Sequence, residues 1–102
     1  MGNITEARKA VVARILEGEG QASREQRRAA FDNAGLPDPL RTLIERVAKH
    51  ANHVTDEDVA AVRAAGLSED QIFEIIVCGA VGQAVRQHER ALAALEAAAR
   101  SD

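Results

Sequence analysis

The segment from Ile72 to Val85, which reads IFEIIVCGAVGQAV, is the feature that most constrains the fold. Apolar residues fill nearly every position, and Glu74 is its one charged residue. A helix that is apolar on every side must be buried on every side. Gly79 and Gly82 would weaken such a helix, so their presence indicates that another helix packs closely against it. We therefore expect a buried central helix here.

Composition and capping patterns predict that the rest of the chain is also helical. Alanine dominates, supported by other strong helix formers, and no segment alternates with period two. Ser23 with Gln26, and Ser68 with Gln71, have the spacing of capping boxes, and Thr55 with Asp58 is a variant of it. Glycines follow the first, second and fourth segments as candidate left-handed caps: Gly18, Gly20, Gly35 and Gly66. We expect an all-α fold, a compact bundle of about five helices near residues 4–17, 23–34, 39–52, 55–65 and 68–100.

A chain of 102 residues fits one domain, 1–102. The predicted helix 39–52 has the clearest apolar stripe, spaced to form one face of a helix. The predicted helix 23–34 has Phe31 as its one large apolar residue, beside a row of three arginines, Arg24, Arg27 and Arg28. We expect this second helix to lie on the surface, with the arginines in solvent.

Charge and composition exclude several classes of partner. The net charge is −3 and aromatic residues make up 2%, so the chain lacks the basic stripe and stacking platforms of nucleic-acid binding proteins. The longest uncharged run, 75–85, is too short to span a membrane. There is no apolar leader near the start and a single cysteine, so we expect a cytoplasmic protein without cofactor, nucleic acid or membrane partner.

The predicted helix 68–100 is too long for a domain of this size. At 1.5 Å per residue it would extend about 50 Å, against a domain diameter of about 26 Å. It either bends between Gly79 and His88 or packs on another subunit. We expect a homo-oligomer with the 72–85 face in the interface.

The stretch from Val54 to Val85, VTDEDVAAVRAAGLSEDQIFEIIVCGAVGQAV, has a turn at Gly66 and a helix cap at Ser68. This stretch resembles the alkylhydroperoxidase D / carboxymuconolactone decarboxylase-like superfamily, and the resemblance extends back to Leu40. It implies a small all-helical domain that assembles as a trimer or hexamer. Residues 1–36 would supply N-terminal helices and residues 37–102 the family-like core.

The peroxidase branch of that superfamily uses a CxxC pair followed by a histidine before this turn. Those places fall on Ala51, Val54 and Asp58, none of which has the required side chain. Thiol chemistry needs a thiolate nucleophile and a base that activates it. The resemblance therefore implies a divergent member without the family's redox activity.

Glu74 and Cys78 are candidate functional residues within the apolar segment. A carboxylate among apolar side chains is costly unless it is paired, neutral or at a pocket. Glu74 would therefore either act as a general acid or base, or pair with Arg46 or Arg63, or face a solvent groove. We expect Cys78 to be a buried, inert thiol; the alternative is a one-cysteine peroxidatic site with Glu74 as base.

His50 and His53 share a helix face near the end of the third predicted helix. They could stabilise the negative end of that helix, transfer protons, or bind a metal together with Asp56 or Asp58. No third ligand from elsewhere is evident, so we expect no metal site. His50 is a candidate catalytic residue with Glu74, and His53, Asp58 and Cys78 are candidate binding residues.

Two classes of function follow from these residues. The first is a non-redox oligomeric protein of this superfamily, a small-ligand-binding or scaffold domain. The second is a cofactor-free enzyme that transfers protons on a small carboxylate or lactone, with Glu74 and His50 as acid and base. Residual one-cysteine peroxidase activity ranks third. An unrelated four-helix interaction module is the alternative fold reading, and it would be a monomer with an exposed C-terminal helix.

Overall fold

Five α-helices and one short 3₁₀ turn make up the computed structural model, which describes the backbone of residues 3–100 and the side chains of residues 6–100. The elements are α1 (Asn3–Glu17), α2 (Arg24–Asp32), α3 (Leu40–Lys49), the turn η1 (Ala51–His53), α4 (Asp56–Ala64) and α5 (Glu69–Arg100). No strand occurs within residues 3–100, and the predicted all-α bundle is confirmed. None of the helices in this range is long and apolar enough to cross a membrane.

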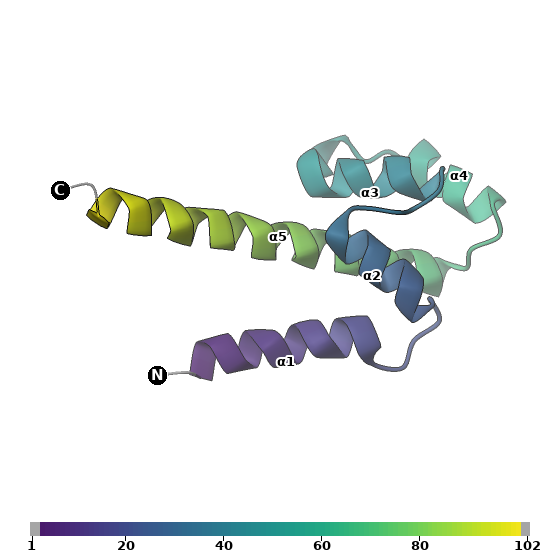
Figure 1. Ribbon diagram of the computed structural model, residues 1–102. Coiled ribbons are helices and arrows are strands. Elements are labelled where there is room, and N and C mark those ends of the chain that lie inside the picture. The colour runs from purple at the N-terminus through teal and green to yellow at the C-terminus, as the bar shows by residue number, and fades with distance from the viewer. Residues whose placement is uncertain (1–2, 101–102) are drawn as a thin grey trace.

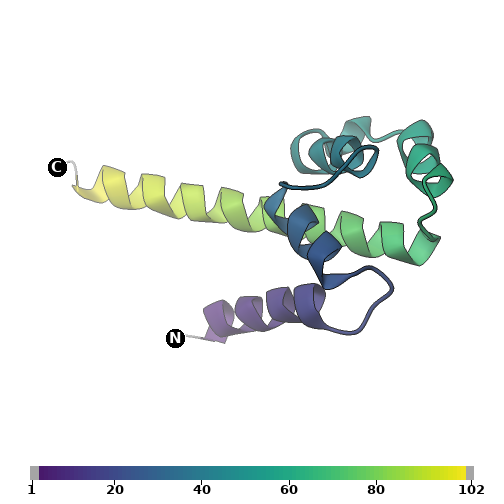
Figure 2. The same ribbon diagram turned by 45° about the vertical axis from the view of Figure 1, so that its right-hand side comes forward.

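Helix α5 is the axis on which the other helices pack (Figure 1). Helix α2 crosses its middle, α3 and α4 lie to one side, and α1 runs alongside in the opposite direction (Figure 2). The far end of α5 extends beyond all of them, and the molecule measures 54 × 28 × 21 Å. The result is a compact bundle with one long projecting helix.

The core lies where α3, α4 and the first half of α5 meet. Its largest fully buried side chains are Leu43, Ile44, Val62, Ile75 and Cys78. They come from three helices that are separate in sequence, and their burial supplies the main driving force for folding. The apolar stripe predicted for the third helix therefore faces the core, as expected.

Helix α2 does not lie on the surface, contrary to the sequence-based expectation. Ala30 is fully buried, and Arg27 is only 5% exposed. A Cβ placed on Gly82 of α5 would collide with the carbonyl oxygen of Phe31, so the two backbones touch at this point. Arg86 donates a hydrogen bond from Nη1 to the same Phe31 carbonyl. The short side chains of α2 and α5 allow an approach that the number of large apolar residues did not indicate.

Three predicted N-terminal caps are confirmed, and the predicted glycine cap of α2 is corrected. Ser23, Thr55 and Ser68 each accept a hydrogen bond from the backbone N–H three residues later. Helix α2, however, ends at Asn33 with φ 51°, a left-handed residue that precedes Gly35. Asparagine tolerates this conformation because its short polar side chain bonds locally.

Helix α5 runs without interruption from Glu69 to Arg100, so the bend considered for it is not observed. Gly79 and Gly82 face other helices of the same chain, since a Cβ on Gly79 would meet Ile44 of α3 and one on Gly82 would meet Phe31 of α2. The segment 72–85 is not buried on every side as expected, because Phe73 is 68% exposed. From Gln87 onward every described residue is exposed. The two halves of one helix thus have different surroundings.

Candidate functional site

Glu74 holds the loop that joins α1 to α2. Its two carboxylate oxygens, Oε1 and Oε2, accept hydrogen bonds from the backbone N–H of Gln21 at 3.0 and 2.8 Å. One turn earlier on α5, Gln71 donates from Nε2 to the Gln21 carbonyl at 3.2 Å. A Cβ on Gly20 would collide with the Glu74 carboxylate, so a larger residue there would displace the Glu74 side chain from Gln21. The charge of Glu74 is therefore stabilised by a backbone N–H, and neither Arg46 nor Arg63 pairs with it.

Arg27 crosses from α2 to the end of α1. Its Nη1 donates hydrogen bonds to the carbonyls of Ile15 at 3.1 Å and Gly18 at 2.7 Å. The last carbonyls of a helix have no intrahelical partner, and a guanidinium there also favours the negative end of the helix dipole. The side-chain nitrogen Nε is buried and has no hydrogen-bond partner. Arg27 thus replaces the left-handed glycine cap that the sequence suggested for α1.

Cys78 is fully buried directly behind these groups, as expected. Burial raises the pKa of the thiol to about 11, with Arg27 opposing the shift and Glu74 adding to it. Its Sγ lies 3.8 Å from the carbonyl oxygen of Ile15, which also accepts from Arg27. A thiol with such a pKa is protonated at neutral pH, so it is a poor nucleophile.

A pocket of about 160 Å³ opens beside these residues, between α1, α2 and α5. Its charged lining consists of Arg27, Glu74 and two exposed side chains, Arg14 and Glu19. Its apolar lining consists of Ile15, Phe73 and Val77. Phe73 is 68% exposed, a large apolar side chain left at the edge of the pocket. Of the predicted site residues, Glu74 lines this pocket and Cys78 lies next to it.

His50 and His53 lie at the end of α3 and in η1. Both are exposed, and their rings stack with centroids 5.4 Å apart. His50 is the C-terminal cap residue of α3. Neither histidine lines the pocket that contains Glu74. Within residues 6–100, no group of three histidine, cysteine or acidic side chains is close enough to hold a metal ion.

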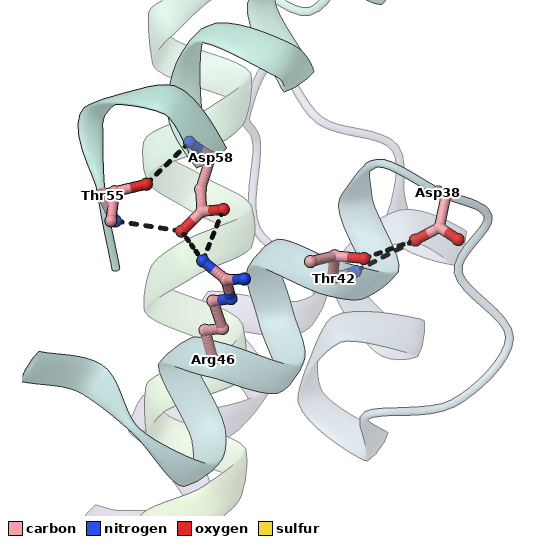
Figure 3. Close-up of polar contacts among 5 residues, drawn as sticks. All are labelled: Asp38, Thr42, Arg46, Thr55 and Asp58. Atoms are coloured by element: carbon pink, nitrogen blue, oxygen red, sulfur yellow. Dashed lines mark hydrogen bonds and ion pairs between the residues drawn. The ribbon is translucent and has the colours of Figure 1, made fainter. Parts of the chain in front are cut away.

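Asp58 joins α4 to α3 (Figure 3). It accepts a hydrogen bond from the Thr55 backbone N–H at 3.0 Å, and both its oxygens accept from Arg46 Nη1 at 2.8 and 2.9 Å. The Thr55 N–H, followed by Arg46, lowers the pKa of the Asp58 carboxyl below its usual value. The side chain is 12% exposed. This candidate binding residue is engaged in a structural contact.

Asp38 has a similar role at the start of α3 (Figure 3). Its Oδ1 accepts hydrogen bonds from the hydroxyl of Thr42 at 2.8 Å and from the Thr42 backbone N–H at 3.3 Å. The Thr42 hydroxyl, followed by Arg41, lowers the pKa of the Asp38 carboxyl. Asp38 thus supplies the side-chain cap that Pro39, which precedes α3, cannot provide.

The residues that sequence reasoning missed are Arg27, Gln21 and Gly20. Arg27 was grouped with two neighbouring arginines that are indeed exposed, and nothing in its spacing distinguishes it from them. The position of Gln21 matters through its backbone, which no side-chain pattern records. Only Gly20 was noted in the sequence, as a candidate cap after the first helix. In the structure its lack of a side chain makes room for the Glu74 carboxylate instead.

A second, larger groove lies between α1, the second half of α2 and α5, with a volume of about 410 Å³. Its apolar lining includes Val12, Leu16, Phe31 and Val85, and Glu89 lies at the end nearest the projecting part of α5. The groove therefore continues onto the exposed half of α5, residues 87–100.

No family model, curated protein or solved structure matches the chain.

Proposed function

We propose that the chain is a non-enzymatic helical scaffold that associates with further copies of itself through the projecting half of α5. The observation that carries this proposal is the exposure of every residue from Gln87 to Arg100, including Leu92 at 45% and Leu95 at 67%. A helix of this length is marginal in water without a packing partner. An apolar stripe on it is best explained by a surface that covers it.

The stripe on this part of α5 has the spacing of a helix–helix seam. Val85, His88, Leu92, Leu95 and Ala99 follow at alternating steps of three and four residues. This spacing is typical of helices that pack side by side. The seam continues into the groove between α1 and α5, because Val85 belongs to both. A second copy could therefore cover the seam and the groove together.

The resemblance described above supports the same proposal. We propose a divergent relationship to the alkylhydroperoxidase D / carboxymuconolactone decarboxylase-like superfamily, whose members assemble as trimers or hexamers. The turn at Gly66, with φ 106°, and the capped start of α5 at Ser68 agree with the resemblance. A free thiol supports the cytoplasm as its compartment.

The enzymatic alternatives receive less support. Glu74 is bound to a backbone N–H and does not share a pocket with His50, as the acid–base reading requires within one chain. Cys78 is buried with a pKa of about 11, which argues against a one-cysteine peroxidase. Peroxide turnover that disappears in Cys78→Ser would contradict the non-enzymatic proposal.

The test of self-association is light scattering coupled to size-exclusion chromatography, at several protein concentrations. We expect a discrete oligomer, and we expect the double variant Leu92→Gln/Leu95→Gln to become a monomer because it removes the apolar part of the seam. The matched control is Ala93→Gln/Ala97→Gln, which adds the same side chains on the other side of the helix. It should keep the oligomer. A wild-type monomer would overturn the proposal and favour the unrelated interaction module with an exposed C-terminal helix.

A further inference from the structure

We propose that the pocket between α1, α2 and α5 binds an α-amino acid with a small apolar side chain. The pocket brings opposite charges to one cavity of about 160 Å³ without letting them neutralise each other. Arg27 and Glu74 both line it, yet no ion pair joins them in the described part of the chain. This arrangement fits a ligand that carries a negative and a positive group.

Each charge is fixed by a separate backbone contact. Arg27 is tied through Nη1 to the carbonyls at the end of α1. Glu74 is tied to the N–H of Gln21 in the following loop. Since both side chains are already anchored, neither can move to the other without losing its own hydrogen bonds. The separation of the two charges is therefore built into the fold.

The guanidinium of Arg27 provides the group for a carboxylate. Both hydrogen bonds of Arg27 use Nη1, and on the opposite edge, formed by Nε and Nη2, the buried Nε has no hydrogen-bond partner among the described residues. This edge is the one that binds carboxylates with two parallel hydrogen bonds. The residue is 5% exposed, and an ionic contact in such surroundings is stronger than one in water. Arg14, which also lines the pocket, adds a second positive charge.

The carboxylates of Glu74 and Glu19 provide the partners for an ammonium group. The two arginines and two glutamates that line the pocket have a net formal charge of zero, so a ligand with balanced charges leaves it neutral. Ile15, Phe73 and Val77 form the apolar wall. The exposed ring of Phe73 would be covered by an apolar side chain of the ligand.

Isothermal titration calorimetry with L-valine tests the proposal. We expect saturable binding of one ligand per chain. Isovalerate lacks the ammonium group of valine and isobutylamine lacks the carboxylate, while both keep the branched apolar part. Each should bind at least ~10-fold more weakly, because each leaves a charged group of the pocket without its partner. Absence of saturable valine binding, or equal binding of the three compounds, would overturn the proposal.

Variants locate the binding site. Arg27→Gln should abolish valine binding, with circular dichroism used to check that the variant folds, since Arg27 also caps α1. Arg14→Gln removes an exposed charge that the fold does not use, and it should weaken binding about 2- to 5-fold. The control is Arg24→Gln, an exposed arginine of α2 outside the pocket, which should bind like the wild type. Equal affinity of the Arg14 and Arg24 variants with the wild type would contradict this placement.

Discussion

The two halves of α5 are helical for different reasons. Residues 69–85 contain Gly79, Gly82 and several β-branched side chains, which are poor helix formers, and one side of this half is buried against other helices. Residues 86–100 are rich in alanine and exposed throughout from Gln87. The first half is therefore held by packing within the chain, whereas the second relies on high intrinsic propensity together with the cover that we propose a second copy provides. Continuity of a helix in sequence does not imply a common source of stability.

This difference also separates the functional proposals. The buried half supplies Glu74, which fixes the α1–α2 loop and lines the small pocket. The bare half supplies Leu92 and Leu95, which are exposed and which we propose as part of a seam between subunits. A substitution in the first half should change the fold or the pocket, whereas one in the second half should change only assembly. The predictions below test this division of roles.

The largest expected effect is that of Gly82→Ala in the buried half. The added Cβ would collide with the Phe31 carbonyl oxygen and approach the Phe31 carbonyl carbon to 2.7 Å. Backbone atoms cannot move aside as a side chain can, so α2 must shift away from α5. We expect a loss of about 2–3 kcal/mol in the free energy of unfolding, even though alanine favours a helix over glycine by ~1 kcal/mol. Urea denaturation followed by circular dichroism measures it.

Two controls calibrate that result. A Cβ on Gly79 would meet the side chain of Ile44 at 3.2 and 3.3 Å and the Ala30 carbonyl oxygen at an ordinary contact distance of 3.7 Å, so Gly79→Ala should cost less than about 1 kcal/mol. Ala97→Val in the exposed half should change stability by about 0.5 kcal/mol or less. A Gly82→Ala variant as stable as either control would mean that α2 does not rest on α5 at this point.

A smaller effect is expected for Glu74→Gln. The amide keeps one acceptor oxygen but loses the charge that strengthens the two hydrogen bonds from Gln21. Hydrogen bonds to charged groups contribute about 1.5–3 kcal/mol, so we expect a loss of about 1–2 kcal/mol in the free energy of unfolding. Glu69→Gln is the matched control because its ion pair with Arg63 is exposed on both sides and should contribute less than about 1 kcal/mol. Equal losses for the two variants would show that the loop is not held by Glu74.

The sequence predicted the helices well because their starts and periods are local properties. Ser23, Thr55 and Ser68 cap the helices that they were expected to cap, and the stripe of the third helix faces the core. The burial of Cys78 followed from the apolar residues around it. Features that depend on residues close together in the sequence could therefore be predicted from it.

The contacts of the pocket were not predictable in the same way. Arg27 is buried where a helix end and a loop, 12 and 9 residues away, present carbonyls to it. Glu74 was expected to need a partner, but that partner is a backbone N–H 53 residues earlier. Arginines were the only partners considered because a backbone group has no identity in a sequence. The prediction that α2 lies on the surface was wrong for a related reason. The helix packs closely through small residues, whereas the prediction rested on its low number of large apolar residues.

The smallest expected effect is that of Asp58→Asn in α4, which should change how the free energy of unfolding depends on pH. Asp58 ties α4 to α3, two helices that cover the buried half, and the Thr55 N–H and Arg46 lower its pKa. Because the pKa is lower in the folded chain than in the unfolded one, this carboxylate stabilises the fold above about pH 4, and the contribution is lost as the pH falls through the folded value. The variant should be less stable than the wild type at about pH 7, and the gap should be smaller at about pH 3. Urea denaturation at both pH values measures the gap, with Asp56→Asn, an exposed carboxylate of the same turn, as the control. A gap of the same size at both pH values would show that the tie between α3 and α4 does not depend on the charge of Asp58, and that the buried half of α5 owes its cover to apolar packing alone.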